Sequence, residues 1–458
     1  EAASEALAAY EQNVSDATRL LDQSEPFKAL ECLTNARAQK GFSRGSEAME
    51  AMSRIALSLP RQGFSGGWET TSAPSLESPS YAVAIDHTGT RALSGDEHGK
   101  LTLWDVVRGE ISTQWPTEAG DIRCVAFGMD GKSVLLGSAA GGSSVLQLWD
   151  LPKKKLLASM NGHTRPVLGL ALSSDGQWAL SAGADGDVRQ WDLEQGRCLR
   201  RYQGQGGQVF AVALLPDGEH FVSGDEDGAI RLWRLGAKRC KAVWRGHRGQ
   251  VFSLAVSADG QSICSAGSDH LVIIWDIKSG RPRQALQGHS GFIRAVVMTA
   301  DGGCALSASS DGTLRLWELT KGTLLRSFAG NHGPFHNAAL SGDSQRLVTT
   351  GADHTVHFWQ LDWRYSAPPD ATWDPRAERL MKLYLKNRRN RLRAISGIPQ
   401  KNRSDLTLSI REAATELRTT LGESGLGWIS EQTLKRHLSD AMRGNWYTLS
   451  GLMTKLRR

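Results

Sequence analysis

The sequence predicts a mainly β fold, a seven-bladed β-propeller flanked by N-terminal and C-terminal α-helical segments. The main evidence is a series of tryptophans that recur in steps of 45, 42, 42, 42, 42 and 42 residues. Each tryptophan ends a short apolar run, as in VIIWD at 272–276. A period of about 40–45 residues that ends in Trp-Asp is typical of one four-stranded blade, so seven periods predict seven blades. The series is Trp104, Trp149, Trp191, Trp233, Trp275, Trp317 and Trp359.

Glycine turns follow the same period. In five blades a glycine stands 15 residues before the tryptophan, and in four of these it follows an aspartate, as expected for a tight turn between strands. Gly131 stands 18 residues before Trp149, so the long step of 45 residues reflects a three-residue insertion, which we place in the loop at 137–145. The five regular turn glycines are Gly89, Gly176, Gly218, Gly260 and Gly302.

Residues 67–365 are expected to form the propeller, with helices on both sides of it in the chain. Residues 1–62 hold Ala-rich, Leu-spaced segments, which predict a helical segment similar to a tetratricopeptide-like hairpin. The chain offers no outer strand after Trp359, so residues 67–73 are expected to supply the outer strand of blade 7 and to close the ring. Residues 366–458 predict a basic C-terminal helical domain, with helices at 376–395, 405–421, 431–443 and 446–457.

Composition excludes several classes of protein. The 458 residues include no run of 18 apolar residues, so we expect no membrane-spanning helix. The first residues carry no signal-peptide pattern, and the missing initial methionine suggests a fragment or a processed chain. The six cysteines form no CxxC pair and are expected to be free thiols in a reducing compartment, so we expect a cytoplasmic location.

The net charge of +6 is unevenly placed along the chain. Residues 366–458 hold 18 Lys/Arg and 9 Asp/Glu, a balance of +9, so the other residues carry −3. Segment 376–403 has ten cations and one acid, and we interpret it as a solvated helix face, because it lacks aromatic residues at regular intervals for base stacking. The alternative is binding of nucleic acid or another anionic surface. The candidate anion-binding residues are Lys386, Arg388, Arg389, Arg391 and Arg393.

Four blades repeat a quartet of His, Ser or Thr, Asp and Trp. A catalytic Ser-His-Asp triad is one site with an exposed nucleophile, whereas these sets recur with the blade period, so we interpret them as structural hydrogen-bonded networks. The sets are His163, Ser181, Asp185 and Trp191; His247, Ser265, Asp269 and Trp275; His289, Ser307, Asp311 and Trp317; and His332, Thr349, Asp353 and Trp359.

These quartets and the in-register repeats resemble the WD40 family over 67–365. The resemblance implies a ring in which each quartet links the indole, hydroxyl, imidazole and carboxylate of one blade. Three blades depart from the pattern. Blade 4 keeps Ser223, Asp227 and Trp233 but has Gln205 in place of His; blade 1 has Leu76 at the His position and His98 at the Asp position; blade 2 has no His.

The family resemblance also implies that partners bind the face where loops lead into the innermost strands. The repeat register places one residue per blade beside the bulge that opens each inner strand, and the set stays in phase with the tryptophans. These are large apolar, aromatic or Arg side chains, the types that dominate interface hot spots, and burial under neighbouring loops is the alternative interpretation. The candidate partner-binding residues are Tyr81, Arg123, Leu168, Phe210, Phe252, Arg294 and His336, with Glu97 and Glu226 as acidic contacts.

Together these patterns predict a non-catalytic scaffold or adaptor that binds a protein partner on the propeller face and helps assemble or regulate a larger complex. The partner could be an effector domain on the same or another chain. The sequence has no phosphate-loop, metalloprotease or kinase motif, so we expect no enzyme activity, no cofactor and no metal site. The flanking segments resemble those of large bacterial WD40 proteins, in residues 29–55, 358–365 and 425–438.

Overall fold

The structure, a computed structural model, divides the chain into two compact units. One unit is Gly66–Asp362, and the other combines Glu1–Ser65 with Trp363–Arg458. The structure describes residues 2–23, 25–39, 41–56, 59, 61–73, 76–128, 130–139, 145–204, 206–329, 333–365, 375–394, 410–423, 429 and 431–443.

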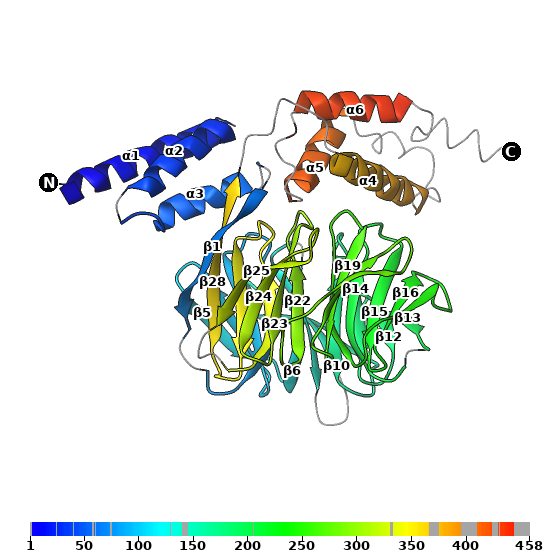
Figure 1. The fold of residues 1–458 in the computed structure, drawn as a ribbon. Coiled ribbons are helices and arrows are strands. Elements are labelled where there is room, and N and C mark those ends of the chain that lie inside the picture. The colour runs from blue at the N-terminus through cyan, green and yellow to red at the C-terminus, as the bar shows by residue number, and fades with distance from the viewer. Residues whose placement is uncertain are drawn as a thin grey trace. The chain divides into compact units, whose positions relative to one another are not determined.

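The described residues form seven four-stranded antiparallel sheets, which are the seven predicted blades (Figure 1). Blade 1 holds β2 (Ser80–Ile85), β3 (Arg91–Asp96), β4 (Lys100–Asp105) and β5 (Glu110–Pro116). Blade 2 holds β6 (Asp121–Phe127), β7 (Ser133–Ala139), β8 (Val145–Asp150) and β9 (Lys155–Asn161). Blade 3 holds β10 (Val167–Leu172), β11 (Trp178–Gly183), β12 (Val188–Asp192) and β13 (Arg197–Tyr202).

The other blades repeat this order of strands from the inside of the ring to its rim. Blade 4 holds β14 (Val209–Leu214), β15 (His220–Asp225), β16 (Ala229–Arg234) and β17 (Ala242–Arg245). Blade 5 holds β18 (Val251–Val256), β19 (Ser262–Gly267), β20 (Val272–Asp276) and β21 (Pro282–Leu286). Blade 6 holds β22 (Ile293–Met298), β23 (Cys304–Ser309), β24 (Thr313–Glu318) and β25 (Thr323–Ala329). Blade 7 holds β26 (Phe335–Leu340), β27 (Arg346–Gly351), β28 (Val356–Tyr365) and β1 (Arg61–Ser72).

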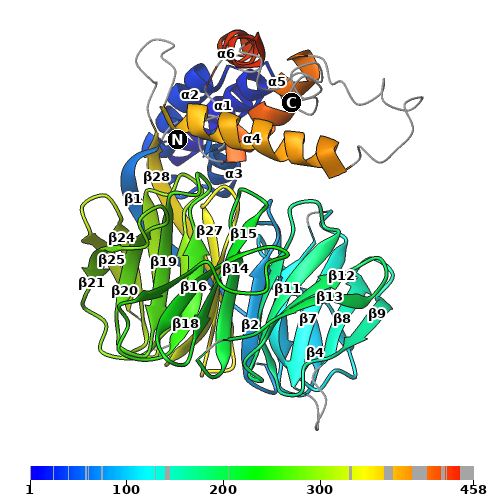
Figure 2. The same cartoon turned by 90° about the vertical axis from the view of Figure 1, so that its right-hand side faces the viewer.

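The ring closes at two places. The innermost strands of neighbouring blades contact one another in turn, and β26 of blade 7 contacts β2 of blade 1. At the rim, β1 pairs with β28, so a strand from before the first repeat completes the last blade (Figure 2). β1 begins at Arg61, six residues before the predicted strand at 67–73 and inside the segment predicted to be helical. The longer strand lies opposite β28, which runs through Tyr365.

The tight turns explain the periodic glycines. Gly131, Gly176, Gly218, Gly260 and Gly302 all have φ between +61° and +68°, a left-handed conformation that a residue without Cβ adopts at little cost. In blade 7 the corresponding residue, Ser344, also has a positive φ of +57°. The loop extension predicted at 137–145 falls between β7 and β8, and residues 140–144 of it lie outside the described residues.

The periodic tryptophans lie in the core between neighbouring blades. Trp104, Trp191, Trp233 and Trp275 are no more than 1% exposed. Trp275 of blade 5 stacks on Trp244 of blade 4 with ring centroids 6.1 Å apart, in a cluster that includes Ile230 and Val251. Because each such cluster joins two sheets, burial of the apolar strand faces holds neighbouring blades together.

The N-terminal helices are α1 (Ala2–Asp22), α2 (Pro26–Ala38) and α3 (Ser46–Ala56). Tyr10 of α1 links this segment together, because its hydroxyl donates to Glu47 Oε2 over 2.8 Å and accepts from the Ala48 amide over 3.2 Å. Its ring stacks on Phe42 with centroids 4.5 Å apart. The similarity to a tetratricopeptide-like hairpin stays a prediction.

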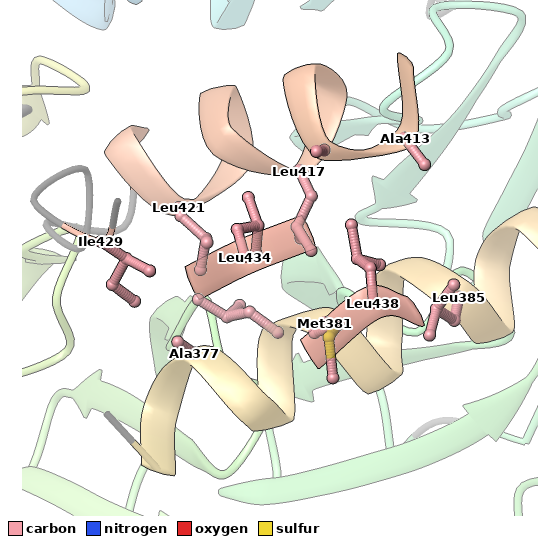
Figure 3. Packing of buried hydrophobic residues seen from close by; sticks show 11 residues of the cluster. Ala377, Met381, Leu385, Ala413, Leu417, Leu421, Ile429, Leu434 and Leu438 are labelled. Atoms are coloured by element: carbon pink, nitrogen blue, oxygen red, sulfur yellow. The ribbon is translucent and has the colours of Figure 1, made fainter. Parts of the chain in front are cut away.

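The C-terminal helices share a hydrophobic cluster of their own (Figure 3). They are α4 (Pro375–Ala394), α5 (Ile410–Glu423) and α6 (Glu431–Arg443), and residues 405–409 of the predicted second helix lie outside the described residues. Leu385 of α4, Leu417 of α5 and Leu438 of α6 are all at most 3% exposed in this cluster. The helix predicted at 446–457 lies outside the described residues.

Candidate functional site

The seven candidate partner-binding residues occupy the same structural position in every blade. In each inner strand the antiparallel register shifts by one residue at the predicted position, which is the signature of a β-bulge. A bulge places two residues opposite one and redirects the extra side chain. The bulged residues are Tyr81, Arg123, Leu168, Phe210, Phe252, Arg294 and His336.

We call the seven bulged residues together the bulge ring. Within it, the bulged residues of blades 7, 1 and 2 contact one another. The rings of Tyr81 and His336 lie 5.0 Å apart, and the Arg123 guanidinium stands 4.5 Å from the centroid of Tyr81. Arg123 also forms an ion pair with Asp121 of the same strand. Asn337 donates to the backbone oxygen of Tyr81 over 3.2 Å, so a side-chain hydrogen bond links blades 7 and 1.

The part of the bulge ring from blades 4, 5 and 6 is an aromatic cluster around one arginine. Phe210 and Phe252 meet edge to face with centroids 5.2 Å apart. The Arg294 guanidinium lies 4.6 Å from the centroid of Phe252 and 5.5 Å from that of Phe292. Phe292 is 43% exposed, and the centroid of its ring lies 5.8 Å from that of the His270 ring. Phe292 and His270 were missed by the sequence analysis, because they fall outside the one-residue-per-blade register.

The remaining candidates contribute less to these contacts. Leu168 is half-buried on its bulge. Glu226 is held by its own blade, since its carboxylate accepts from the Gln208 amide over 3.1 Å. Glu97 is exposed, and its charge is among the influences that raise the pKa of Asp121, after burial of that carboxyl. The structure therefore places Glu97 near the paired Asp121, on the blade 1 and 2 side of the ring.

The electrostatic field at the bulge ring is positive near His336. Burial lowers the pKa of His336, and the nearby charges of Arg294, His354 and Arg123 lower it further against the opposing influence of Asp353. Burial also lowers the pKa of the Arg294 guanidinium. Because the low pKa keeps His336 neutral near pH 7, the fixed cations of this surface are Arg123, already paired, and Arg294.

Three predicted quartets form hydrogen-bonded chains in the structure. In blade 3 the Trp191 indole donates to Ser181 Oγ over 2.8 Å, Ser181 lies 2.7 Å from His163 Nε2, and His163 Nδ1 lies 2.9 Å from Asp185. The sets of blades 5 and 6 have the same connections, with distances from 2.6 to 2.9 Å. All three serines are 0% exposed, so none could meet a substrate as a nucleophile.

The quartet carboxylates are held ionised. Burial alone would raise the pKa of Asp185, but the hydrogen bond and charge of His163, with backbone amides, outweigh it and lower the pKa to about 2. In blade 6 burial is again opposed by hydrogen bonds from Thr313 and His289, and the pKa of Asp311 falls to about 2. The pKa of Asp269 is lowered in the same way.

The described part of the blade 7 network includes a histidine outside the predicted set. Trp359 donates to Thr349 over 3.0 Å, and His332 of the predicted set lies outside the described residues. Asp353 contacts His357 Nε2 over 2.8 Å, and His357 Nδ1 lies 2.6 Å from Glu69 of β1. This histidine, 2% exposed, therefore joins the closing strand to the last blade, and the sequence analysis did not identify it.

Blade 4 replaces the quartet by a buried ion pair that sequence reasoning missed. Ser223 accepts from the Trp233 indole over 3.0 Å, but Asp227, at the predicted Asp position, is exposed, and Gln205 lies outside the described residues. The buried acid is Asp225, 0% exposed, which pairs with Arg231 of β16. Three backbone amides, of Gly206, Asp227 and Ala229, also donate to Asp225 over 3.1 Å.

In blades 1 and 2 the periodic tryptophan donates its indole hydrogen bond to a side chain of its own blade. In blade 1 Trp104 donates to Ser94 over 2.9 Å, while Ser78 donates to Asp96 over 2.8 Å. His98, at the Asp position, is exposed. In blade 2 the Trp149 indole donates to Gln147 over 2.9 Å. The described residues contain no group of three or more His, Cys, Asp or Glu placed to hold a metal ion.

The basic C-terminal segment includes helix α4. α4 contains the five candidate anion-binding residues, but their side chains lie outside the described residues. No helix in the described part of the chain has both the length and the apolar character that a membrane crossing requires. All six cysteines are described, and none of them forms a disulfide bond.

Comparison with known proteins identifies the repeat. The family described as WD40, "WD domain, G-beta repeat", matches residues 154–192, 196–234, 238–276, 280–318 and 322–360, and each match ends one residue after a periodic tryptophan. The chain is also 34% identical over 107 residues to Transducin beta-like protein 3 of Bos taurus and 32% identical to that of Rattus norvegicus. These alignments cover 23% of this chain and 13% of the relatives. TBC1 domain family member 31 of Bos taurus is 27% identical over 103 residues, which cover 22% of this chain and 9% of that relative.

Proposed function

We propose that this chain, a WD40-repeat protein with a seven-bladed β-propeller, is a non-catalytic scaffold that captures a protein partner on its bulge ring. The main support is the cluster of Phe210, Phe252, Phe292 and Arg294, where aromatic side chains from three blades gather without being fully buried. Aromatic and arginine side chains dominate binding energy at protein interfaces.

The backbone supports this proposal as well. Each candidate side chain stands on a bulge of a strand that pairs along its length within a sheet, so the surface is rigid before a partner arrives. Rigid anchors lose little conformational entropy on binding, which raises affinity for a given contact area. The buried networks behind the bulges therefore serve binding by fixing the blades.

Paired substitution of Phe210 and Phe252 by Ala tests the proposal. We expect capture of the endogenous partner, identified by crosslinking of the full chain, to fall by tenfold or more, because each ring is about the size of a hot-spot residue. The matched control is Leu324→Ala with Leu325→Ala, since both leucines are exposed on β25 at the rim. Equal capture by the two double variants, with unchanged thermal unfolding, would remove the bulge ring as the binding surface.

The finer parts of the proposal concern the biological setting. We propose that the partner is a component of a larger complex, such as an effector domain on the same or another chain, and that the protein works in the cytoplasm as a regulatory adaptor. The relatives reported above are mammalian, so the bacterial origin suggested by the flanking segments stays a prediction.

Binding of nucleic acid or an anionic surface through segment 376–403 stays the alternative. It rests on the charge of the sequence, ten cations against one acid, and on no described side-chain contact. A pulldown across a salt series separates the two functions. Binding through phosphates should weaken steeply with the logarithm of salt concentration, whereas an interface centred on aromatic side chains should weaken little.

A further inference from the structure

Arg294 is the one bulge residue whose charge and geometry point to a particular ligand chemistry. Its guanidinium lies 4.6 Å from the ring of Phe252 and 5.5 Å from that of Phe292, and the residue is exposed. Among the described residues it has no hydrogen bond and no ion pair, so the two ring contacts hold it in place. A guanidinium has five N–H donors at its edge, and contact with ring faces leaves that edge free.

Arg123, the other arginine of the bulge ring, has an acidic partner, whereas Arg294 has none among the described residues. Arg123 lies 4.5 Å from the ring of Tyr81 in a similar way, but its charge is neutralised by Asp121 on the same strand. The residue that corresponds to Asp121 in blade 6 is Phe292. Blade 6 therefore presents the same arginine with a second aromatic ring in place of the carboxylate.

The surroundings of Arg294 favour an incoming negative charge. Partial burial lowers the pKa of this guanidinium, because the rings remove water from the charged form. No acid is among the influences on that pKa, and Arg294 and Arg123 both disfavour a positive charge on the neighbouring His336. The carboxylates of the adjacent quartets, Asp269 and Asp311, are already paired with His247 and His289. A partly desolvated cation gains more from a carboxylate than a fully hydrated one does.

We propose that Arg294 binds the carboxylate of an Asp or Glu side chain in an acidic peptide segment of the partner, with an apolar side chain of that segment packed on Phe252 and Phe292. This assignment rests on the proposed function and adds the chemistry of the partner to it. Phe292, which is 43% exposed, fits this role because it continues the aromatic surface beyond the arginine. Its backbone is fixed, since its oxygen accepts from both the amide and the hydroxyl of Ser310, over 2.8 and 3.1 Å.

Selection from a display library of random short peptides on the full chain tests the proposal. The enriched sequences should contain Asp or Glu close to Leu, Phe or another large apolar residue. A labelled copy of an enriched peptide is then compared with a copy in which Gln or Asn replaces the acids. We expect Arg294→Gln to weaken binding of the acidic peptide by about tenfold or more and to leave binding of the neutral copy unchanged.

The control variant has the same net charge as Arg294→Gln. Arg326→Gln removes one exposed arginine from β25 of the same blade, and it should change affinity by less than about twofold. Equal effects of Arg294→Gln on the acidic and neutral peptides would overturn the carboxylate assignment. A peptide that binds only when it carries phosphoserine would also overturn it.

The same experiment separates this proposal from the proposed function. Enriched peptides without acids that are lost on Phe210→Ala with Phe252→Ala would leave the scaffold function intact and make the acidic partner wrong. Peptides that tolerate both the double substitution and Arg294→Gln, or the absence of any enriched sequence, would count against both.

Discussion

Blades 3 and 4 are neighbours with the same strand order, yet they bury polar groups in different ways. Blade 3 uses a chain from Trp191 to Asp185 through a serine and a histidine. Blade 4 keeps the indole-to-serine contact but buries the ion pair of Asp225 and Arg231. Both solutions leave the central indole paired, so the fold tolerates exchange of one polar network for another.

The position of Gly183 shows one difference between the two blades. Gly183 of blade 3 corresponds to Asp225 of blade 4. A Cβ at Gly183 would lie 2.4 Å from His163 Nδ1, so a side chain at this position of blade 3 would displace the histidine, although blade 6 keeps its quartet with the small Ser309 there. Asp225 fills that space with a carboxylate, which binds the Gly206 amide and Arg231 instead. The histidine network of blade 3 and the ion pair of blade 4 thus differ at two positions, His163 against Gln205 and Gly183 against Asp225.

The largest expected effect comes from breaking the ion pair of blade 4. Asp225→Ala should lower the free energy of unfolding by about 3–5 kcal/mol, because it leaves Arg231, 6% exposed, as an unpaired buried charge. Adding Arg231→Met should restore most of this loss, since it removes the stranded cation. Urea unfolding of both variants measures the difference. A double variant less stable than Asp225→Ala would contradict this account of blade 4.

The network of blade 3 should give a smaller effect that depends on pH. Asp185 has a pKa of about 2 in the folded chain against an ordinary value of 3.8, so its stabilising contribution is complete above about pH 4 and is lost as the pH falls toward 2. Asp185→Asn should therefore cost about 1.5–3 kcal/mol at pH 7. The gap between wild type and variant should narrow in acid unfolding curves below pH 4. A gap that is constant from pH 7 to pH 3 would show that the charge of Asp185 contributes nothing.

The blade number and the WD40 repeat are confirmed, because a period that repeats seven times can be read from the tryptophans alone. The bulge positions could also be predicted, since the bulged residue stands 23 residues before the periodic tryptophan in every blade except blade 2, which carries the three-residue insertion. Both the number of blades and the positions of the bulges follow from the spacing of residues along the chain, which also sets the register of the strands.

The ion pair of blade 4 could not be predicted in the same way. Arg189 of blade 3 and Arg315 of blade 6 occupy the same position in their blades as Arg231. In the sequence, Arg231 therefore resembles an ordinary polar residue of an alternating pattern. A signal was nevertheless present, because blade 4 has both Gln205 at the histidine position and Asp225 at the glycine position. Phe292 contacts Phe252 and His270 of the neighbouring blade, and His357 contacts the closing strand, so no single repeat encodes these contacts.

The smallest expected effect is at Asp227, where sequence and structure disagree. Asp227 stands 42 residues after Asp185 and would be the quartet carboxylate by alignment, but it is exposed while the buried charge has moved to Asp225. Asp227→Ala should therefore change the free energy of unfolding by less than about 0.5 kcal/mol, as surface substitutions usually do. Asp185→Ala, the same substitution one blade earlier, should cost several times more, because it leaves His163 without its partner. Equal losses in urea unfolding would mean that Asp227 stabilises blade 4 as Asp185 stabilises blade 3, and the distinction between the two networks would fail.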